Sequence, residues 1–105
     1  MYLLTSTLSK NDDNEYVKYS ETNGPMITLD IFIGDPDYVG KGLAVDIIHT
    51  FLVNHYPDVT EVFIDPERTN HRAIHVYEKA GFKKVGEFIA SWHPVPHDIM
   101  RYSKA

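Results

Sequence analysis

Residues 26–44 read MITLDIFIGDPDYVGKGLA, and this stretch decides the fold. Its first part, 26–33, is a β-prone and nearly continuous apolar run, which is typical of a strand covered on both faces. The next part, 34–42, contains three glycines and a proline and cannot be regular structure. The last part begins a helix. A strand, a glycine loop and a helix in this order predict the first half of a strand–helix–strand unit.

The helix is expected to run from Leu43 to His55. Its apolar residues fall at steps of four, one, three and one, which places them on one helix face: Leu43, Ile47, Ile48, Phe51 and Leu52. Pro57 cannot continue a helix and marks its end.

Downstream, 59–64 is a β-prone run and predicts the second strand of the unit. A loop over 65–69 follows, and Thr69 or Asn70 can cap a helix that runs to about Ala80. Gly81 is a suitable left-handed terminator for that helix. The remaining elements are expected to be a strand over 82–89, a loop over 91–97 and a strand over 98–102.

Upstream, 2–8 is apolar and β-prone, and a polar turn separates it from a short strand expected over 16–19. The two would form a hairpin. The order is therefore β-β-β-α-β-α-β-β, a mixed α/β (α+β) sheet with a parallel portion and antiparallel edges. A length of 105 residues fits a single domain over 1–105.

The composition excludes several kinds of site. Without cysteine there is no disulfide framework, thiolate zinc site or cysteine nucleophile. His71 and His75 have metal-ligand spacing but lack a third ligand, so no metal site is expected. No apolar run approaches a bilayer span and no signal peptide begins the chain, so we expect a cytoplasmic protein without membrane contact.

The net charge of −5 argues against a nucleic-acid partner, which would require a basic face. The charge is uneven: residues 1–66 hold 11 acidic and 3 basic side chains, whereas residues 67–105 hold 4 acidic and 7 basic ones. This division is compatible with a cationic substrate beside an anionic cofactor, but charge alone favours a solvated surface of mixed sign.

Gly40 and Gly42 stand between the predicted strand and the helix. Glycines allow the backbone to approach a ligand closely, and the N–H groups and dipole of a helix N-terminus favour an anion such as a diphosphate. The spacing is neither that of a P-loop nor that of a dinucleotide fingerprint. Taken alone, the two glycines are equally compatible with a plain strand-to-helix turn.

Three separated sequence blocks favour the anion-binding loop over the plain turn: YVGKGLA at 38–44, NHRAI at 70–74 and VYEKAGF at 76–82. Together they resemble the GNAT superfamily of acetyl-CoA-dependent N-acetyltransferases, whose acyl-CoA loop reads Arg/Gln-x-x-Gly-x-Gly/Ala. Residues 29–38 and 64–66 resemble the aminoglycoside 6′-N-acetyltransferase branch. The resemblance covers about residues 26–90. Val39 departs from it, since the family has Arg or Gln there.

The resemblance implies roles for individual residues. Asp30 would be the base that deprotonates an amine, Asp65 would anchor that amine, and Tyr77 would donate a proton or hydrogen bond to the leaving sulfur. Acetyl-CoA would be held by the ends of the strand and the helix, by the glycine loop and by an asparagine: Phe32, Ile33, Val39, Gly40, Lys41, Gly42, Leu43, Ala44 and Asn70.

The function implied is transfer of an acetyl group to a primary amine of a small cationic acceptor, such as an aminoglycoside. The family's fold opens with a strand and two helices for which this chain has no room, so we expect a GNAT-like core truncated at the N-terminus. Two alternatives stay open: a non-catalytic CoA-binding or interaction module, and another acyl transfer with the same cofactor loop. A homodimer that completes the acceptor site also stays open.

Overall fold

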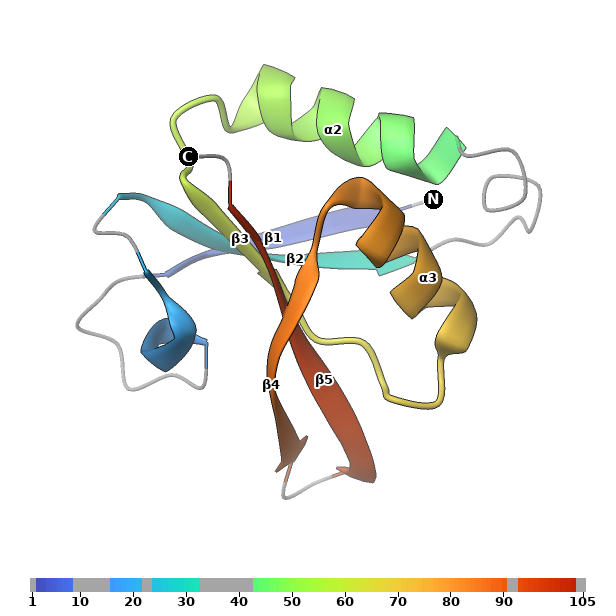
Figure 1. The fold of residues 1–105 in the computed structure, drawn as a ribbon. Helices are drawn as coiled ribbons and strands as arrows, with labels where there is room; N and C mark the ends of the chain where they lie inside the picture. Colours follow the sequence, from blue (N-terminus) through green and yellow to red (C-terminus); the bar gives the residue numbers. More distant parts are fainter. Residues whose placement is uncertain (1, 9–15, 22–23, 33–42, 91–92, 104–105) are drawn as a thin grey trace.

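The computed structural model describes residues 2–8, 16–21, 24–32, 43–90 and 93–103. Five strands form one sheet in the order β1-β2-β3-β5-β4. They are β1 (Tyr2–Leu8), β2 (Met26–Phe32), β3 (Glu61–Ile64), β4 (Lys83–Ala90) and β5 (His93–Ser103). Two helices, α2 (Leu43–His55) and α3 (His71–Ala80), lie on one side of the sheet (Figure 1). The expected mixed fold is confirmed.

The sheet has one parallel pair at its centre. β2 and β3 run parallel, as the crossover through α2 requires, and all other neighbours are antiparallel. Both expected antiparallel edges are present, as β1 against β2 and as β4 against β5. The carboxyl ends of β2 and β3 therefore lie at the same edge of the sheet.

The two helices begin and end as their sequences predict. The Asn70 side chain caps α3 by accepting a hydrogen bond of 3.2 Å from the Ala73 backbone N–H. Gly81 ends the helix in the left-handed region with φ 105°, where a side chain would be strained. For α2, the boundaries Leu43 and His55 match the expectation, and Tyr56 follows the helix.

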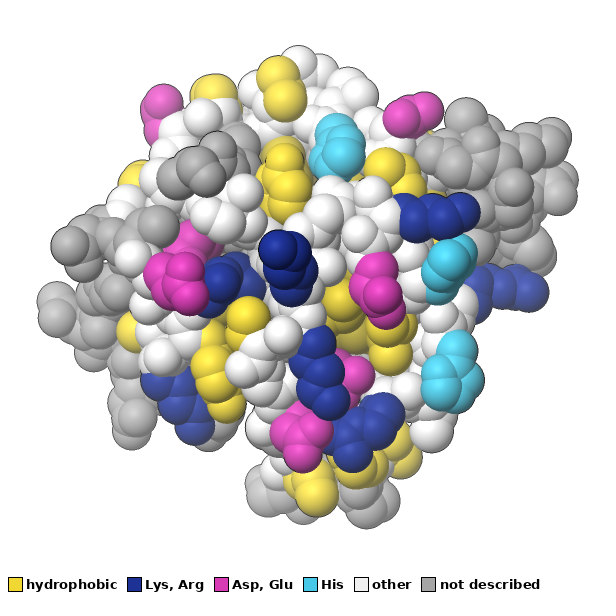
Figure 2. Space-filling model, viewed as in Figure 1, with side chains coloured by type: hydrophobic (Ala, Val, Ile, Leu, Met, Phe, Trp, Pro, Cys, Tyr) yellow, Lys and Arg dark blue, Asp and Glu magenta, His cyan; other side chains and the backbone are white. Residues whose placement is uncertain are grey.

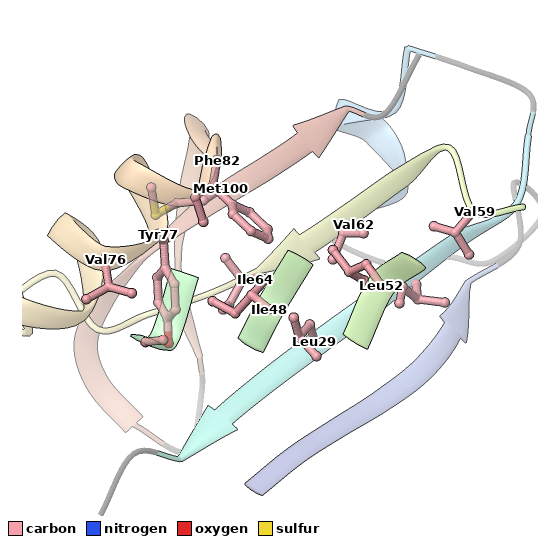
Figure 3. Close-up of a cluster of buried hydrophobic side chains, with 13 residues drawn as sticks. Leu29, Ile48, Leu52, Val59, Val62, Ile64, Val76, Tyr77, Phe82 and Met100 are labelled. Atoms are coloured by element: carbon pink, nitrogen blue, oxygen red, sulfur yellow. The ribbon is translucent and has the colours of Figure 1, made fainter. Parts of the chain in front are cut away.

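The main core lies between the sheet and the two helices. Leu29 and Ile64 from β2 and β3 meet Ile48 and Leu52 from α2 in this layer. Figure 3 shows Tyr77 projecting from α3 into the same layer, beside Ile48 and Ile64. All four aliphatic residues are nearly or completely buried, so this face supplies most of the apolar burial that stabilises the fold.

The opposite face of the sheet has a smaller cluster formed by Leu8, Met26, Phe63 and Ile99. It is covered by a short 3₁₀ helix, η1 (Val17–Tyr19), with Tyr16 as its N-cap residue. The prediction of a strand over 16–19 is therefore wrong. β1 pairs along its whole length with β2, so it does not form a hairpin with 16–19. A 3₁₀ turn instead brings residues three apart onto one side, which directs Tyr16 and Tyr19 onto the apolar cluster.

The loop expected over 91–97 is also wrong in its larger part, because β5 begins at His93. Pro94 and Pro96 suggested a loop, since proline cannot donate to a ladder. Both prolines lie where the β4–β5 pairing is irregular: Ala90 pairs with His93 and Phe88 with His97, so more residues of β5 than of β4 span this stretch. Proline is tolerated at such an irregularity, because fewer ladder hydrogen bonds are required there. The Pro96 carbonyl accepts a hydrogen bond from the Arg68 N–H.

None of the helices among the described residues is both long enough and apolar enough to cross a membrane.

Candidate active site

The candidate site lies where β2 and β3 stop pairing. Their register consists of the three pairs Met26–Glu61, Ile27–Val62 and Thr28–Phe63. Beyond Thr28, β2 continues to Phe32 alongside β1, while β3 ends at Ile64 and pairs with β5. Within the described residues, the two central strands thus have no ladder between them past this point.

Asp30 and Asp65 each follow the last register pair by two residues. Side chains two residues apart in an extended chain point to the same face, so both carboxylates belong to the face of Thr28 and Phe63. This is the face opposite the helices. The charge of Asp30 is one of the causes that raise the pKa of Asp65, which agrees with two carboxylates at one site.

Asp65 is partly buried, and this burial is the main reason that its pKa lies above the ordinary value. The phenol of Tyr16 donates a hydrogen bond to its carboxylate, which opposes the shift. Asp30 raises the pKa further, and His97 lowers it. Burial, followed by the charge of Asp65, also raises the pKa of Tyr16, so the phenol stays protonated and remains a donor.

His97 fixes the backbone of Asp65. Its Nδ1 lies 2.9 Å from the carbonyl oxygen of Asp65 and 3.5 Å from Oδ2 of the same residue. A carbonyl oxygen can only accept, so Nδ1 bears a proton. Two further backbone hydrogen bonds join this loop to β5, from Asp98 N–H to Pro66 O at 3.0 Å and from Arg68 N–H to Pro96 O at 2.9 Å. The loop after β3 is therefore held in place beside β5.

A cluster of ion pairs strengthens the same attachment. Arg68 contacts both Glu87 and Asp98, the latter at 3.1 Å from its Nε, and Lys84 Nζ lies 3.2 Å from Glu87 and 3.4 Å from Asp98. Figure 2 shows basic and acidic side chains side by side over the lower part of the molecule, where β4 and β5 lie. Asp98 is almost buried, whereas Glu87 is exposed. The ion pairs of Asp98 therefore contribute more to the stability of this attachment than those of Glu87.

Tyr77 approaches the site from the helix-covered face. Its side chain is 5% exposed, and its ring centroid lies 6.1 Å from that of Phe82. Burial, then the charges of Asp30 and Asp65, raises the pKa of Tyr77 to about 12. The phenol thus remains protonated at neutral pH and can donate a hydrogen bond to an anion formed between the two strands.

The residues expected to bind a cofactor fall into three groups. Asn70 is exposed and caps α3, so the capping role given by its sequence is confirmed. Phe32 ends β2, and Leu43 and Ala44 open α2, with Ala44 buried in the main core. The others lie outside the described residues: Ile33, Val39, Gly40, Lys41 and Gly42.

Two residues of this site have no signal in the sequence. Tyr16 belongs to the segment that was expected to be a strand, and His97 to the segment that was expected to be a loop. Their partner Asp65 is 49 and 32 residues away along the chain, so only the tertiary structure brings the three together.

Comparison with known proteins identifies the family. Residues 10–90 match the acetyltransferase (GNAT) domain. Aminoglycoside N(6′)-acetyltransferase type 1 of Klebsiella pneumoniae is 35% identical over 68 residues, which are 63% of this chain and 34% of that protein. The kanamycin resistance protein of Rhizobium radiobacter is also 35% identical over 68 residues, 63% of each chain. This chain thus spans about a third of the Klebsiella protein's length.

Solved structures agree with this result. The crystal structure of the aminoglycoside N(6′)acetyltransferase from Legionella pneumophila superposes with a TM-score of 0.79 at 49% identity, over 97% of this chain and 55% of that chain. AAC(6′)-Ib in complex with ribostamycin and coenzyme A gives a TM-score of 0.60 at 30% identity, over 75% of this chain and 44% of that chain. The fold, the motifs and the matched residues agree, and the chain belongs to the acetyltransferase (GNAT) domain family.

Proposed function

We propose that this chain transfers the acetyl group of acetyl-CoA to a primary amine of a small polycationic acceptor of the aminoglycoside type. The observation that supports this most directly is the pair Asp30 and Asp65 on one face, past the last β2–β3 pair, with the Tyr77 phenol on the other side. The relatives named as aminoglycoside N(6′)-acetyltransferases support the acceptor class. The neighbouring structure with coenzyme A supports the co-substrate.

The two carboxylates suit the acceptor's charge. An aliphatic ammonium group has a pKa of roughly 10, so only about one molecule in a thousand is a neutral nucleophile at pH 7. In our proposal Asp65 binds the cation, and Asp30, which is exposed, accepts one proton of the ammonium group, so that a neutral amine attacks the carbonyl carbon. The new C–N bond replaces the C–S bond, the nitrogen gives its second proton to solvent, and the thiolate leaves.

The opposite face suits the co-substrate. Acetyl-CoA supplies the thioester, and we assign its diphosphate to the N–H groups of the segment from Val39 to Ala44 at the start of α2. Asn70 is assigned to the pantetheine arm. Tyr77 donates a hydrogen bond to the leaving sulfur. With a pKa of about 12 against roughly 8.5 for a thiol, full proton transfer from the phenol is unfavourable, so stabilisation of the thiolate is its main task.

A thiol-release assay with acetyl-CoA and a panel of amines tests the proposal. We expect turnover with polycationic amino sugars, and its loss in Asp30→Asn combined with Asp65→Asn. Asp58→Asn is the matched control, because Asp58 is exposed and precedes β3 at the end away from Asp65. It should retain the activity of the unchanged chain.

Two outcomes would contradict the proposal. If calorimetry detects no acetyl-CoA binding at millimolar ligand, the assignment of acetyl-CoA as co-substrate is wrong. If turnover survives the double substitution, the roles assigned to both carboxylates are wrong. Acetyl-CoA binding without turnover for any amine would instead favour the non-catalytic CoA-binding module.

A further inference from the structure

Glu61 is a carboxylate with an exposed fraction of 0% on the same sheet face as Asp65, four residues earlier in the chain. It accepts a hydrogen bond of 2.5 Å from the Ser20 hydroxyl and one of 3.0 Å from the Glu21 backbone N–H. Both donors belong to the segment 16–21, which contains η1. A fully buried carboxylate on the central strand therefore binds a segment that is 40 residues away along the chain.

Arg101 of β5 completes this attachment. Its Nε lies 3.7 Å from Glu61 Oε2, its Nη1 donates a hydrogen bond of 2.7 Å to the Tyr19 carbonyl, and its Nη2 lies 3.2 Å from Glu21 Oε1. The Tyr19 ring covers Gly86 of β4 so closely that a Cβ on Gly86 would overlap it. The segment 16–21 is thus fixed to the sheet at several points.

Tyr16 is at the start of this fixed segment. Its ring packs against Phe63, with centroids 6.0 Å apart, and its phenol donates to the carboxylate of Asp65, two residues further along the same strand direction. The charge of Asp30 also acts on the Tyr16 phenol, so this residue faces both carboxylates. The fixed position of the segment therefore determines the hydrogen bond from Tyr16 to Asp65.

We propose that Tyr16 is a positioning residue for the acceptor amine. Its phenol holds the Asp65 carboxylate toward the amine, and the Glu61–Arg101 pair holds Tyr16 in place. This inference rests on the function proposed above, since it explains how the amine-binding carboxylate keeps its orientation. A hydrogen bond to a charged group is worth more than one between neutral groups, so its loss is measurable.

Tyr16→Phe is the decisive variant, because it keeps the ring on Phe63 and removes only the hydroxyl. We expect the KM for the amine to rise about tenfold, with the KM for acetyl-CoA unchanged, since we assign acetyl-CoA to the start of α2 and not to Asp65. Tyr19→Phe is the matched control: the same change three residues away in the same segment, next to Gly86 and away from Asp65. It should leave both KM values unchanged.

A second readout does not depend on activity. A carbon-13 titration of the Asp65 carboxyl should give a higher pKa in Tyr16→Phe than in the unchanged chain, because a hydrogen bond that favours the charged form is lost. Tyr19→Phe should titrate like the unchanged chain. Glu61→Gln should move the titration in the same direction as Tyr16→Phe, because it loosens the segment without altering Tyr16 or Asp65.

The outcomes separate the two proposals. If the unchanged chain acetylates no amine, the proposed function is overturned, and the titration still decides whether Tyr16 controls Asp65. If Tyr16→Phe leaves the amine KM and the titration of Asp65 where they were, the positioning role is overturned. The positioning role is also overturned if Tyr16→Phe and Tyr19→Phe raise the KM for the amine and the KM for acetyl-CoA by equal factors. That result would indicate a general loosening of the segment 16–21.

Discussion

The two faces of the sheet are built from the same strands but serve different purposes. On one face, Leu29 and Ile64 are buried beneath α2 and α3 in the main core. On the other, their immediate neighbours Asp30 and Asp65 form the candidate amine site, with Tyr16 and the Glu61–Arg101 pair beside them. A shift of one residue in register would exchange apolar and charged side chains between the faces. Alternation along two strands thus places the apolar core residues and the candidate amine-binding carboxylates on opposite faces.

The largest effect is expected from Asp30→Asn. If Asp30 accepts the proton of the amine, kcat/KM should fall by about 10² to 10⁴ at pH 7. The deficit should shrink as the pH rises toward roughly 10, because an increasing fraction of the amine is then already neutral. Thiol release measured from pH 6 to 10 tests this, and thermal unfolding should be nearly unchanged since Asp30 is exposed. A deficit of constant size at all pH values would instead indicate a binding role.

Leu29→Ala, one residue away on the other face, should affect stability instead of chemistry. Leu29 is 0% exposed, so its truncation leaves a cavity and should lower the free energy of unfolding by about 2–5 kcal/mol. Urea denaturation measures this. Val53→Ala on the exposed side of α2, where the side chain is 63% exposed, is the control and should change stability by less than about 0.5 kcal/mol. Equal losses in both variants would contradict the division between the faces.

Glu61→Gln tests the polar face as a source of stability. The amide is similar in size but uncharged, and we expect the free energy of unfolding to fall by about 1–3 kcal/mol as the charge-assisted hydrogen bonds weaken. Arg101 keeps its contacts with Glu21 and the Tyr19 carbonyl, which limits the loss. Glu78→Gln, on the exposed side of α3, is the control. An unchanged stability of Glu61→Gln would mean that this pair does not hold the segment 16–21.

The smallest effect is expected from Asp65→Asn, which should stabilise the fold at neutral pH. Burial raises the pKa of Asp65 in the folded state above its ordinary value of 3.8, which applies to the unfolded state. At pH values between the unfolded-state pKa and the folded-state pKa, the folded state binds more protons than the unfolded state. The unchanged chain therefore loses stability as the pH rises through this window, and the uncharged amide does not. Asp65→Asn should therefore have a higher Tm than the unchanged chain at pH 7, and the two Tm values should be equal below about pH 4.

Asp58→Asn is the control for the last prediction, because Asp58 is exposed and its substitution should leave Tm unchanged at both pH values. A lower Tm for Asp65→Asn at pH 7 would show that the Asp65 carboxylate stabilises the fold, and that its burial has little cost.

Much of the fold was predictable from local patterns. The helix α2 followed from the spacing of Ile47, Ile48 and Leu52, and α3 from its Asn70 cap and Gly81 terminator. The parallel pair β2 and β3 followed from the helix between them. The errors occurred where long-range contacts outweigh local preference. Most of the segment 16–19 forms a 3₁₀ helix over an apolar cluster, and Pro94 and Pro96 are accommodated in β5 where its pairing with β4 is irregular.

The sequence by itself determined the family and the order of the elements from β2 to β5, and it nominated Asp30, Asp65 and Tyr77 as site residues, because these inferences depend on periodicity, caps and short motifs within a few residues of one another. Only the tertiary structure decided which face each carboxylate occupies and which side chains surround it. Tyr16, Glu61, His97 and Arg101 are far apart along the chain, and their contacts follow from strand register and burial. Such contacts form when separate segments pack against one sheet, and no local pattern encodes them.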